Sequence, residues 1–316
     1  MKNKTVFIEG MSGSGKSSLA QHIWIQLKAQ NVNAEWFHEE ETNHPLYREA
    51  YDALLENNNL EGYQDRIIGN WNAFFSNHEP GLKINIFESQ ILLSNLASLL
   101  WTGYSRADFN CLREFFLSVI NSCKENHYIY LSSENPECIL ENIIKNRGDA
   151  WRTWYIDFFN KSAYAKKNHV PGYAGIIELW KDVHKIGNAF FAQLKCKKIK
   201  LDITAQNWKR YYLDISAYFQ YGFAPPVNAE IELAEYTGRY QWQAEEIKVH
   251  LKNDNLYCDF GWPGLPLIPQ KEKDHFYIKA FPHELQFRRD QGGIDSIKIT
   301  GKDIAGLYGR VYQKIC

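Results

Sequence analysis

The sequence of 316 residues lacks an excess of charge of either sign, a close pair of cysteines and a long apolar run. Its 36 Lys and Arg residues offset 37 Asp and Glu residues, so no global field favours nucleic acid or a membrane surface. None of the six cysteines forms a C-x-x-C pair, which argues against a zinc or disulfide framework and predicts a reducing, cytoplasmic location. No segment approaches the ~18 apolar residues that span a bilayer, and "TVFIE" is too short for a secretion signal.

Alternating strands and helices are predicted along the first two thirds of the chain. Apolar runs near residues 5–9, 34–38, 82–89, 127–133 and 197–204 are typical of strands, and helical spacing of apolar residues recurs between them. This pattern indicates an α/β domain over residues 1–222, with a parallel sheet and helices on both faces. We also expect helices over residues 45–56, 64–75, 90–100, 108–121, 136–146, 150–165, 174–194 and 207–219.

The remainder of the chain has a different character. "FAPPVNAEI", residues 223–231, is predicted to be a linker because of its Pro pair and small residues. Residues 232–316 contain short runs of period two, such as "EIKVHL", "NLYCDF" and "SIKIT", separated by turn residues at 252–255 and 291–293. They predict a small antiparallel β domain.

A phosphate-binding loop is predicted near the start of the chain. Gly10 is followed, after four residues, by Gly15-Lys16-Ser17, and the stretch lies between a predicted strand and a predicted helix. Backbone N–H groups and the helix N-terminus favour phosphate in such a loop. The predicted nucleotide-binding residues are Gly10, Met11, Ser12, Gly13, Ser14, Gly15, Lys16, Ser17 and Ser18. A Gly/Ser turn with an incidental Lys is the other interpretation.

Signatures that would assign this loop to hydrolysis are absent from the sequence. After the loop there is no Asn-Lys-x-Asp guanine reader, no Leu-Ser-Gly-Gly signature and no Asp-Glu pair following an apolar strand. The sequence therefore disfavours a GTPase and a transporter-type ATPase.

Glu88 ends the predicted strand "LKINIFES", and Glu39 follows the strand that ends at His38. Ligands of an open parallel sheet bind beyond the carboxyl ends of its strands. A carboxylate there could accept a hydroxyl proton as general base or help to hold magnesium. The alternatives are a carboxylate that stabilises a helix N-terminus for Glu88 and a solvated acidic turn for Glu39.

Arginines follow the fourth predicted strand. In "NPECILENIIKNRGDAWR", Asn135 and Pro136 open a helix, and Arg147 and Arg152 come at and beyond its end. A mobile segment that carries arginines over a nucleotide would stabilise charge on the transferred phosphoryl group and exclude water. The alternative is a pair of surface arginines that favour the helix dipole.

Residues 1–220 resemble the P-loop small-molecule kinases, which include nucleoside, nucleotide and antibiotic kinases. The resemblance lies in the loop, in "NIFES" with Glu88, and in "YIYLSSENPECILENIIKNRG" through Pro136, Glu137, Ile143 and Arg147. Two features depart from it: Ser89 stands where deoxynucleoside kinases have Arg, and the Asp-Arg pair of thymidylate kinases is missing. The resemblance implies the kinase architecture without naming a nucleoside as substrate.

The C-terminal segment loosely resembles the small β domains appended to β-lactamase-like hydrolases. The resemblance rests on Tyr236-x-Gly238-x-Tyr240 and on a late hairpin with Phe287. It implies a role in binding a partner, in dimerisation or in covering a pocket.

These features together predict an ATP-dependent phosphotransferase that acts on a hydroxyl of a metabolite, a nucleoside-like compound or an antibiotic. The expected catalytic residues are Lys16, Glu88, Arg147 and Arg152, with Ser17 on Mg²⁺ and Glu39 on the substrate. The alternative is a nucleotide-binding NTPase or regulatory module whose β domain binds a partner. A kinase of nucleic-acid ends is a third option, which the neutral charge disfavours. We expect no nucleic-acid or membrane partner, and a homo-oligomer stays open.

Overall fold

The computed structural model describes residues 4–46, 62–76, 83–220 and 232–315. The chain divides into two compact units, one of residues 1–39 and 44–222 and the other of residues 40–43 and 223–316. The predicted helix over residues 45–56 and the predicted linker over residues 223–231 lie largely outside the described residues.

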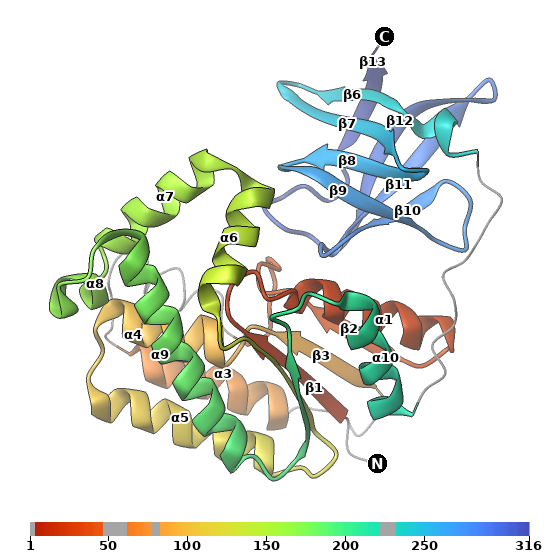
Figure 1. Ribbon diagram of the computed structural model, residues 1–316. Helices are drawn as coiled ribbons and strands as arrows, with labels where there is room; N and C mark the ends of the chain where they lie inside the picture. The colour runs from red at the N-terminus through yellow and green to blue at the C-terminus, as the bar shows by residue number, and fades with distance from the viewer. Residues whose placement is uncertain (1–3, 47–61, 77–82, 221–231, 316) are drawn as a thin grey trace. The chain divides into compact units, whose positions relative to one another are not determined.

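The first unit is built on a parallel sheet of five strands in the order β2-β3-β1-β4-β5 (Figure 1). The strands are β1 (Lys4–Gly10), β2 (Ala34–Phe37), β3 (Ile84–Glu88), β4 (His127–Ser132) and β5 (Lys197–Asp202). Strands β1, β3 and β4 lie at the centre of the sheet, and nearly all of their residues are buried. Both faces of these strands are therefore covered, as the α/β prediction requires.

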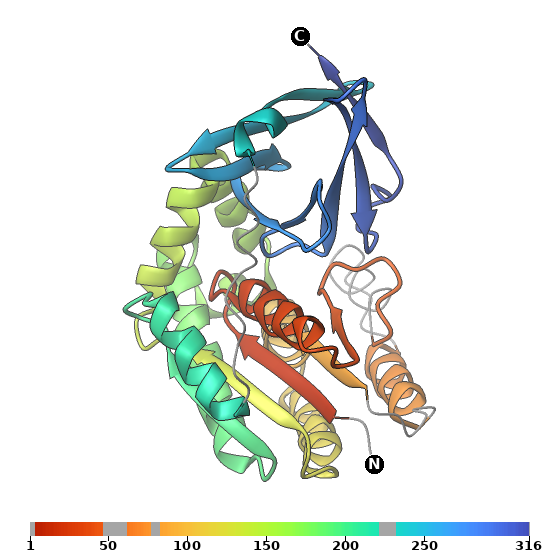
Figure 2. The same cartoon turned by 90° about the vertical axis from the view of Figure 1, so that its right-hand side faces the viewer.

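Helices cover both faces of this sheet (Figures 1 and 2). The helices are α1 (Lys16–Ala29), α3 (Tyr63–Ser76), the π-helix η1 (Leu92–Ala97), α4 (Ser98–Thr102), α5 (Arg106–Asn121), α6 (Pro136–Arg147), α7 (Asp149–Asn160), α8 (Ala163–Asn168), α9 (Gly172–Gln193) and α10 (Trp208–Phe219). On one face, α1 and α10 lie side by side through a His22–Tyr212 stack with ring centroids 4.1 Å apart. On the other, Phe7 of β1 stacks on Trp71 of α3 at 5.8 Å.

Two predicted helices differ from the observed elements. The helix expected over residues 90–100 is a π-helix followed by the short helix α4, because the chain leaves β3 through a turn that the Glu9 side chain holds. The helix expected over residues 150–165 is divided into α7 and α8, and Ser162 caps the second of these by accepting a hydrogen bond from the Ala165 N–H. Asn135 caps α6 as expected, with Pro136 in the first turn.

The second unit is a closed antiparallel barrel with the strand order β10-β11-β12-β13-β6-β7-β8-β9. The strands are β6 (Gly238–Trp242), β7 (Glu245–Lys252), β8 (Asn255–Phe260), β9 (Trp262–Pro269), β10 (His275–Ile278), β11 (His283–Asp290), β12 (Gly293–Gly301) and β13 (Val311–Ile315), and the 3₁₀ turn η2 (Leu233–Tyr236) precedes them. Closure leaves no unpaired sheet edge. The predicted β domain is therefore confirmed as a barrel.

The barrel is filled by its own core. Tyr236, Tyr240, Phe276 and Phe287 are buried, and their rings pack edge to face with centroids 4.9–5.9 Å apart. The residues by which the sequence resembles accessory β domains thus serve as packing inside the barrel. A role in binding a partner stays a prediction.

Candidate functional site

The loop between β1 and α1 has the backbone that a phosphate-binding loop needs. Gly13 and Gly15 have positive φ values of 72° and 85°, which side-chain-bearing residues rarely adopt. A Cβ on Gly13 would lie 2.1 Å from the Ile143 side chain, and one on Gly15 would lie 2.1 Å from the Trp208 ring. Gly10 is confined as well, because its Cβ would lie 2.6 Å from the Leu131 carbonyl oxygen. Close neighbours therefore hold the loop in shape.

Lys16 is held across the loop. It is the first residue of α1, is buried, and donates from Nζ to the Met11 carbonyl oxygen at 2.9 Å. The same carbonyl accepts the Ser14 N–H at 3.2 Å. The Ser14 hydroxyl is buried and finds no hydrogen-bond partner among the described residues. Because the N-cap of α1 is Gly15, no side chain caps the first N–H groups of this helix, and they are open to an anion.

Glu88 lies beside this loop at the end of β3. Its Cα pairs with that of Ile8, so the carboxyl end of β3 lies next to the part of β1 that leads into the loop. The side chain is fully buried; its carboxyl oxygens make no close hydrogen bond in the described part of the chain, but the Ser17 hydroxyl and the Trp36 side chain face them. Burial, and after it the negative charge of Glu39, raises the pKa of Glu88 well above its ordinary value. The Ser17 hydroxyl and the Lys16 charge act in the opposite direction, which places both near the carboxyl group.

The end of β2 faces the same carboxyl group. His38 is buried, and its Nε2 lies 3.7 Å from Glu88 Oε1. Glu39 follows His38 and is close enough to act on the pKa of Glu88. The structure therefore brings the predicted residues Lys16, Ser17, Glu39 and Glu88 together at one edge of the sheet.

Two important residues of this region were not selected from the sequence. Glu9 is fully buried on β1 and accepts hydrogen bonds from the N–H groups of Ile91 and Leu92, both at 2.9 Å. Ser89, directly after Glu88, is buried with a positive φ of 64° and a hydroxyl without a partner within the described ranges. The charged residue inside the apolar run "TVFIEG" was a signal for Glu9, whereas no sequence pattern marks the backbone of Ser89.

The loop also contacts the segment that carries the predicted arginines. Ile143 of α6 packs on Gly13, and Arg147 comes one helical turn later on the same face of α6. The Arg147 guanidinium lies over the Trp151 ring, 5.1 Å from its centroid. Arg152 instead lies over the Tyr173 ring of α9 at 5.5 Å, and Tyr173 is close to Glu137 and Glu141 on a different side of α6. Arg147 of α6 and Arg152 of α7 therefore lie beside different faces of α6.

Three tryptophans of the first unit pack against other aromatic rings: Trp36, Trp71 and Trp101. Trp36 and Trp71 are at most 2% exposed. Trp101 is half-buried and packs on Phe158 and Phe159, with ring centroids 4.9 and 5.5 Å away. We assign these three side chains to packing.

The oxygen atoms near the loop fit magnesium bound together with a nucleotide. Mg²⁺ prefers oxygen ligands and usually takes one or two from the protein, with phosphates and water completing its shell. The Ser17 hydroxyl and the Glu88 carboxyl match this donor set. No group of three or more His, Cys, Asp or Glu side chains in the described ranges could hold a metal by itself.

Comparisons with known proteins yield neither a protein family nor a curated relative: no family profile and no curated protein matches the chain. Among solved structures, the chain is similar to deoxyadenosine kinase from M. mycoides with bound dCTP, at 16% identity over 68% of this chain and 99% of that chain, with a TM-score of 0.39. The same kinase with bound dATP matches at 16% identity over 68% and 98%, with a TM-score of 0.41. Because both TM-scores lie below 0.5, no inference rests on them.

Two further observations concern the chain as a whole. Among the helices described, none is long and apolar enough to cross a membrane. The cysteines at positions 111, 123, 138, 196 and 258 are free thiols.

Proposed function

We propose that this chain is a phosphotransferase that moves the γ-phosphoryl group of ATP to a hydroxyl of a small molecule. The single observation that carries the proposal is the position of Glu88, a fully buried carboxyl group that faces Ser17 and Lys16 at the loop. A buried group of this kind costs free energy, and such costs are concentrated at sites where chemistry uses the group.

The loop is proposed to bind the phosphates of ATP. The N–H groups at the start of α1 point toward the loop, and Lys16 is buried at its centre, where one positive charge offsets phosphate charge. Lys16 exchanges its hydrogen bond to Met11 for one to a phosphate oxygen. Ser17 is the residue that would hold Mg²⁺, which supplies neutralisation of the phosphate charge when bound.

Glu88 is proposed to accept the proton of the acceptor hydroxyl. Burial and the charge of Glu39 raise the pKa of Glu88, which makes its carboxylate a stronger base for that proton. Glu39 follows β2 and is only partly buried, so it is placed to bind polar groups of the acceptor. Both residues lie at the carboxyl ends of neighbouring strands, where ligands of open parallel sheets bind.

Arg147 and Arg152 are proposed to stabilise charge on the transferred group. Arg147 shares the face of α6 that packs on Gly13, which favours it for direct contact with phosphate. Arg152 faces Tyr173 and needs a rearrangement of α7 to reach the same region. We therefore give Arg147 the larger role.

A screen tests the proposal. The chain is incubated with Mg-ATP and a panel of hydroxyl-bearing metabolites, nucleosides and antibiotics, and phosphorylated products are detected by mass spectrometry. We expect at least one phosphorylated acceptor with the natural chain and none with Lys16→Ala. Lys28→Ala serves as the matched control, because Lys28 is an exposed residue of the same helix that lies over the Trp24 ring.

The second candidate, a nucleotide-binding NTPase or regulatory module, predicts another outcome of the same screen. ATP would bind and hydrolyse slowly, and no acceptor would be phosphorylated. That result would overturn the phosphotransferase proposal.

A further inference from the structure

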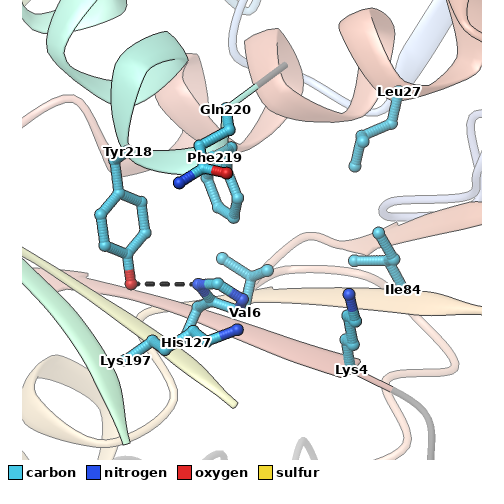
Figure 3. Close-up of a pocket in the computed structure, with 9 residues that line it drawn as sticks. All are labelled: Lys4, Val6, Leu27, Ile84, His127, Lys197, Tyr218, Phe219 and Gln220. Carbon is cyan, nitrogen blue, oxygen red and sulfur yellow. Dashed lines mark hydrogen bonds between the residues drawn. The ribbon is translucent and has the colours of Figure 1, made fainter. Parts of the chain in front are cut away.

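A cavity lies at the edge of the sheet opposite the phosphate loop, where the parallel strands begin (Figure 3). Its volume is about 300 Å³. Strand pairing places its polar residues in a row across this edge: Lys4 pairs with Ile84, Val6 with His127, and His127 with Lys197. The C-terminal ends of α1 and α10 complete the lining, which consists of Lys4, Val6, Leu27, Ile84, His127, Lys197, Tyr218, Phe219 and Gln220.

The polar lining of the cavity is rich in hydrogen-bond donors. Burial lowers the pKa of His127 to about 4, and the charges of Lys197 and Lys4 act in the same direction. The ring is therefore neutral near pH 7. His127 Nδ1 lies 3.0 Å from the Tyr218 hydroxyl (Figure 3). Where Tyr218 donates to Nδ1, the proton of the imidazole is on Nε2, and this N–H is a third donor beside the two ammonium groups.

One carboxylate contacts this lining. None of the lining residues that the structure describes is acidic, but the exposed residue Glu125 pairs with Lys197, its Oε2 lying 3.3 Å from Lys197 Nζ. The ends of α1 and α10 each contribute roughly half a negative charge, so they weaken attraction for an anion. Lys4 and Lys197 carry two positive charges, and Glu125 offsets part of them, so an anion would be held by direct hydrogen bonds from the three donors and not by net charge.

The rest of the lining is mostly apolar. Val6, Leu27 and Ile84 are buried, and Phe219 lies among the lining residues. A ligand that matches this lining carries both an anionic group and an apolar body.

We propose that this cavity binds a small organic anion, a carboxylate or a phosphate ester with an apolar body. The anionic group lies against Lys4, Lys197 and His127, and the apolar body packs on Leu27, Ile84 and Phe219. The site is separate from the phosphate loop, because β1 runs from Lys4 to Gly10, which is roughly 20 Å of extended chain. The same strand and the same helix, α1, connect the two sites. The proposal does not depend on the phosphotransferase reaction.

Histidine-selective NMR of the full chain tests the proposal, since the His127 resonance reports on this cavity and not on the loop. His127→Gln identifies the resonance. Phenyl phosphate, benzoate and inorganic phosphate are titrated at constant ionic strength, with chloride as the reference anion. We expect a saturable shift of His127 with phenyl phosphate or benzoate, at lower concentration than with inorganic phosphate. The preference between phenyl phosphate and benzoate distinguishes a phosphate ester from a carboxylate.

Substitutions locate the bound anion. The double substitution Lys4→Gln with Lys197→Gln is expected to weaken binding at least about tenfold, because it removes two charged donors. Lys195→Gln is the matched control, since Lys195 is exposed and lies outside the lining. It is expected to leave the affinity within twofold. Absence of a saturable His127 shift, or equal affinity of the double variant and the natural chain, overturns the proposal.

Discussion

At the scale of residues, the phosphate-loop edge of the sheet is dominated by two buried carboxyl groups. Glu88 faces Ser17 and Lys16 of the loop, whereas Glu9 accepts hydrogen bonds from two backbone N–H groups. This difference separates their roles. Glu9 fixes the turn that follows β3, and Glu88 remains open to a proton or a ligand.

Glu9 gives the protein a pH-dependent stability. Burial raises the pKa of Glu9 to about 7, above its ordinary value of 4.5. The native state therefore holds the proton up to a higher pH than the unfolded chain, so this stabilising contribution is complete below pH 4.5 and is lost as pH rises to 7. We expect the free energy of unfolding to fall by about 2 kcal/mol between pH 5 and pH 8 relative to Glu9→Gln.

Urea unfolding of both chains across this range measures the effect. Other titrating groups cancel in the difference between the two chains. Parallel stability curves would show that Glu9 does not change its protonation there.

At the scale of elements, the loop and α6 act as a packed pair. Ile143 fills the space next to Gly13, so the loop and the arginine-bearing segment constrain each other. The consequence is that a change in the loop backbone is transmitted to α6, and the reverse.

A substitution at Gly13 separates backbone strain from steric contact. Gly13→Ala is expected to weaken ATP binding at least tenfold, since the positive φ costs about 1–2 kcal/mol and the Cβ contacts Ile143. Adding Ile143→Ala removes the contact but not the strain, so we expect only partial recovery. Calorimetric titration with ATP gives the affinities, and Gly69→Ala is the control because its Cβ meets nothing within 4 Å. If the double variant recovered the affinity of Ile143→Ala alone, backbone strain at position 13 would not contribute.

The two arginines are predicted to differ in their effect on catalysis. Arg147→Ala is expected to lower kcat about a hundredfold, the loss typical of a charge-stabilising donor, and Arg152→Ala to lower it less. Steady-state rates with the acceptor found by the screen provide the test. Lys145→Ala, at an exposed position of the same helix, serves as control. If Arg152→Ala lowered kcat as much as Arg147→Ala does, the larger role assigned to Arg147 would be wrong.

Much of the element order could be predicted from the sequence, because strands β1, β3 and β4 are apolar runs that end in polar residues. The hairpin turn at residues 252–255 could also be predicted, because Asn and Asp are the residue types that favour the positive φ values that Asn253 and Asp254 adopt. Strand β9 was missed because Pro263, Pro266 and Pro269 argue against a strand. The π-helix was missed because its start depends on the Glu9 carboxyl, which lies more than 80 positions earlier in the sequence.

The candidate site likewise combines residues that local sequence patterns predict with features that depend on contacts between distant parts of the chain. Lys16, Ser17 and Glu88 follow from local patterns at strand ends. The opposite orientation of Arg152 depends on the packing of α7 against Tyr173, which no local pattern contains.

At the scale of the whole molecule, each of the two units has its own core. The barrel core centres on Phe287, which contacts the rings of Tyr236, Tyr240 and Phe276. The core of the first unit lies on both faces of its parallel sheet. We therefore expect the two units to respond separately to ligand and to mutation.

Phe287→Ala tests this independence. The substitution is expected to cost the barrel about 3–5 kcal/mol, because it leaves a cavity in the core. In scanning calorimetry we expect two transitions, of which ATP raises one and Phe287→Ala lowers the other. Leu251→Ala, at an exposed position of β7, is the control. A single transition that both changes shift would contradict separate units.

The most direct test of the central claim is phosphoryl transfer by Glu88→Gln. The account predicts that this variant binds Mg-ATP and forms no phosphorylated acceptor under conditions in which the natural chain and the surface variant Glu114→Gln both do. Product is measured by mass spectrometry in single turnover with the acceptor found by the screen. Transfer by Glu88→Gln at the natural rate would contradict the assignment of Glu88 as the base.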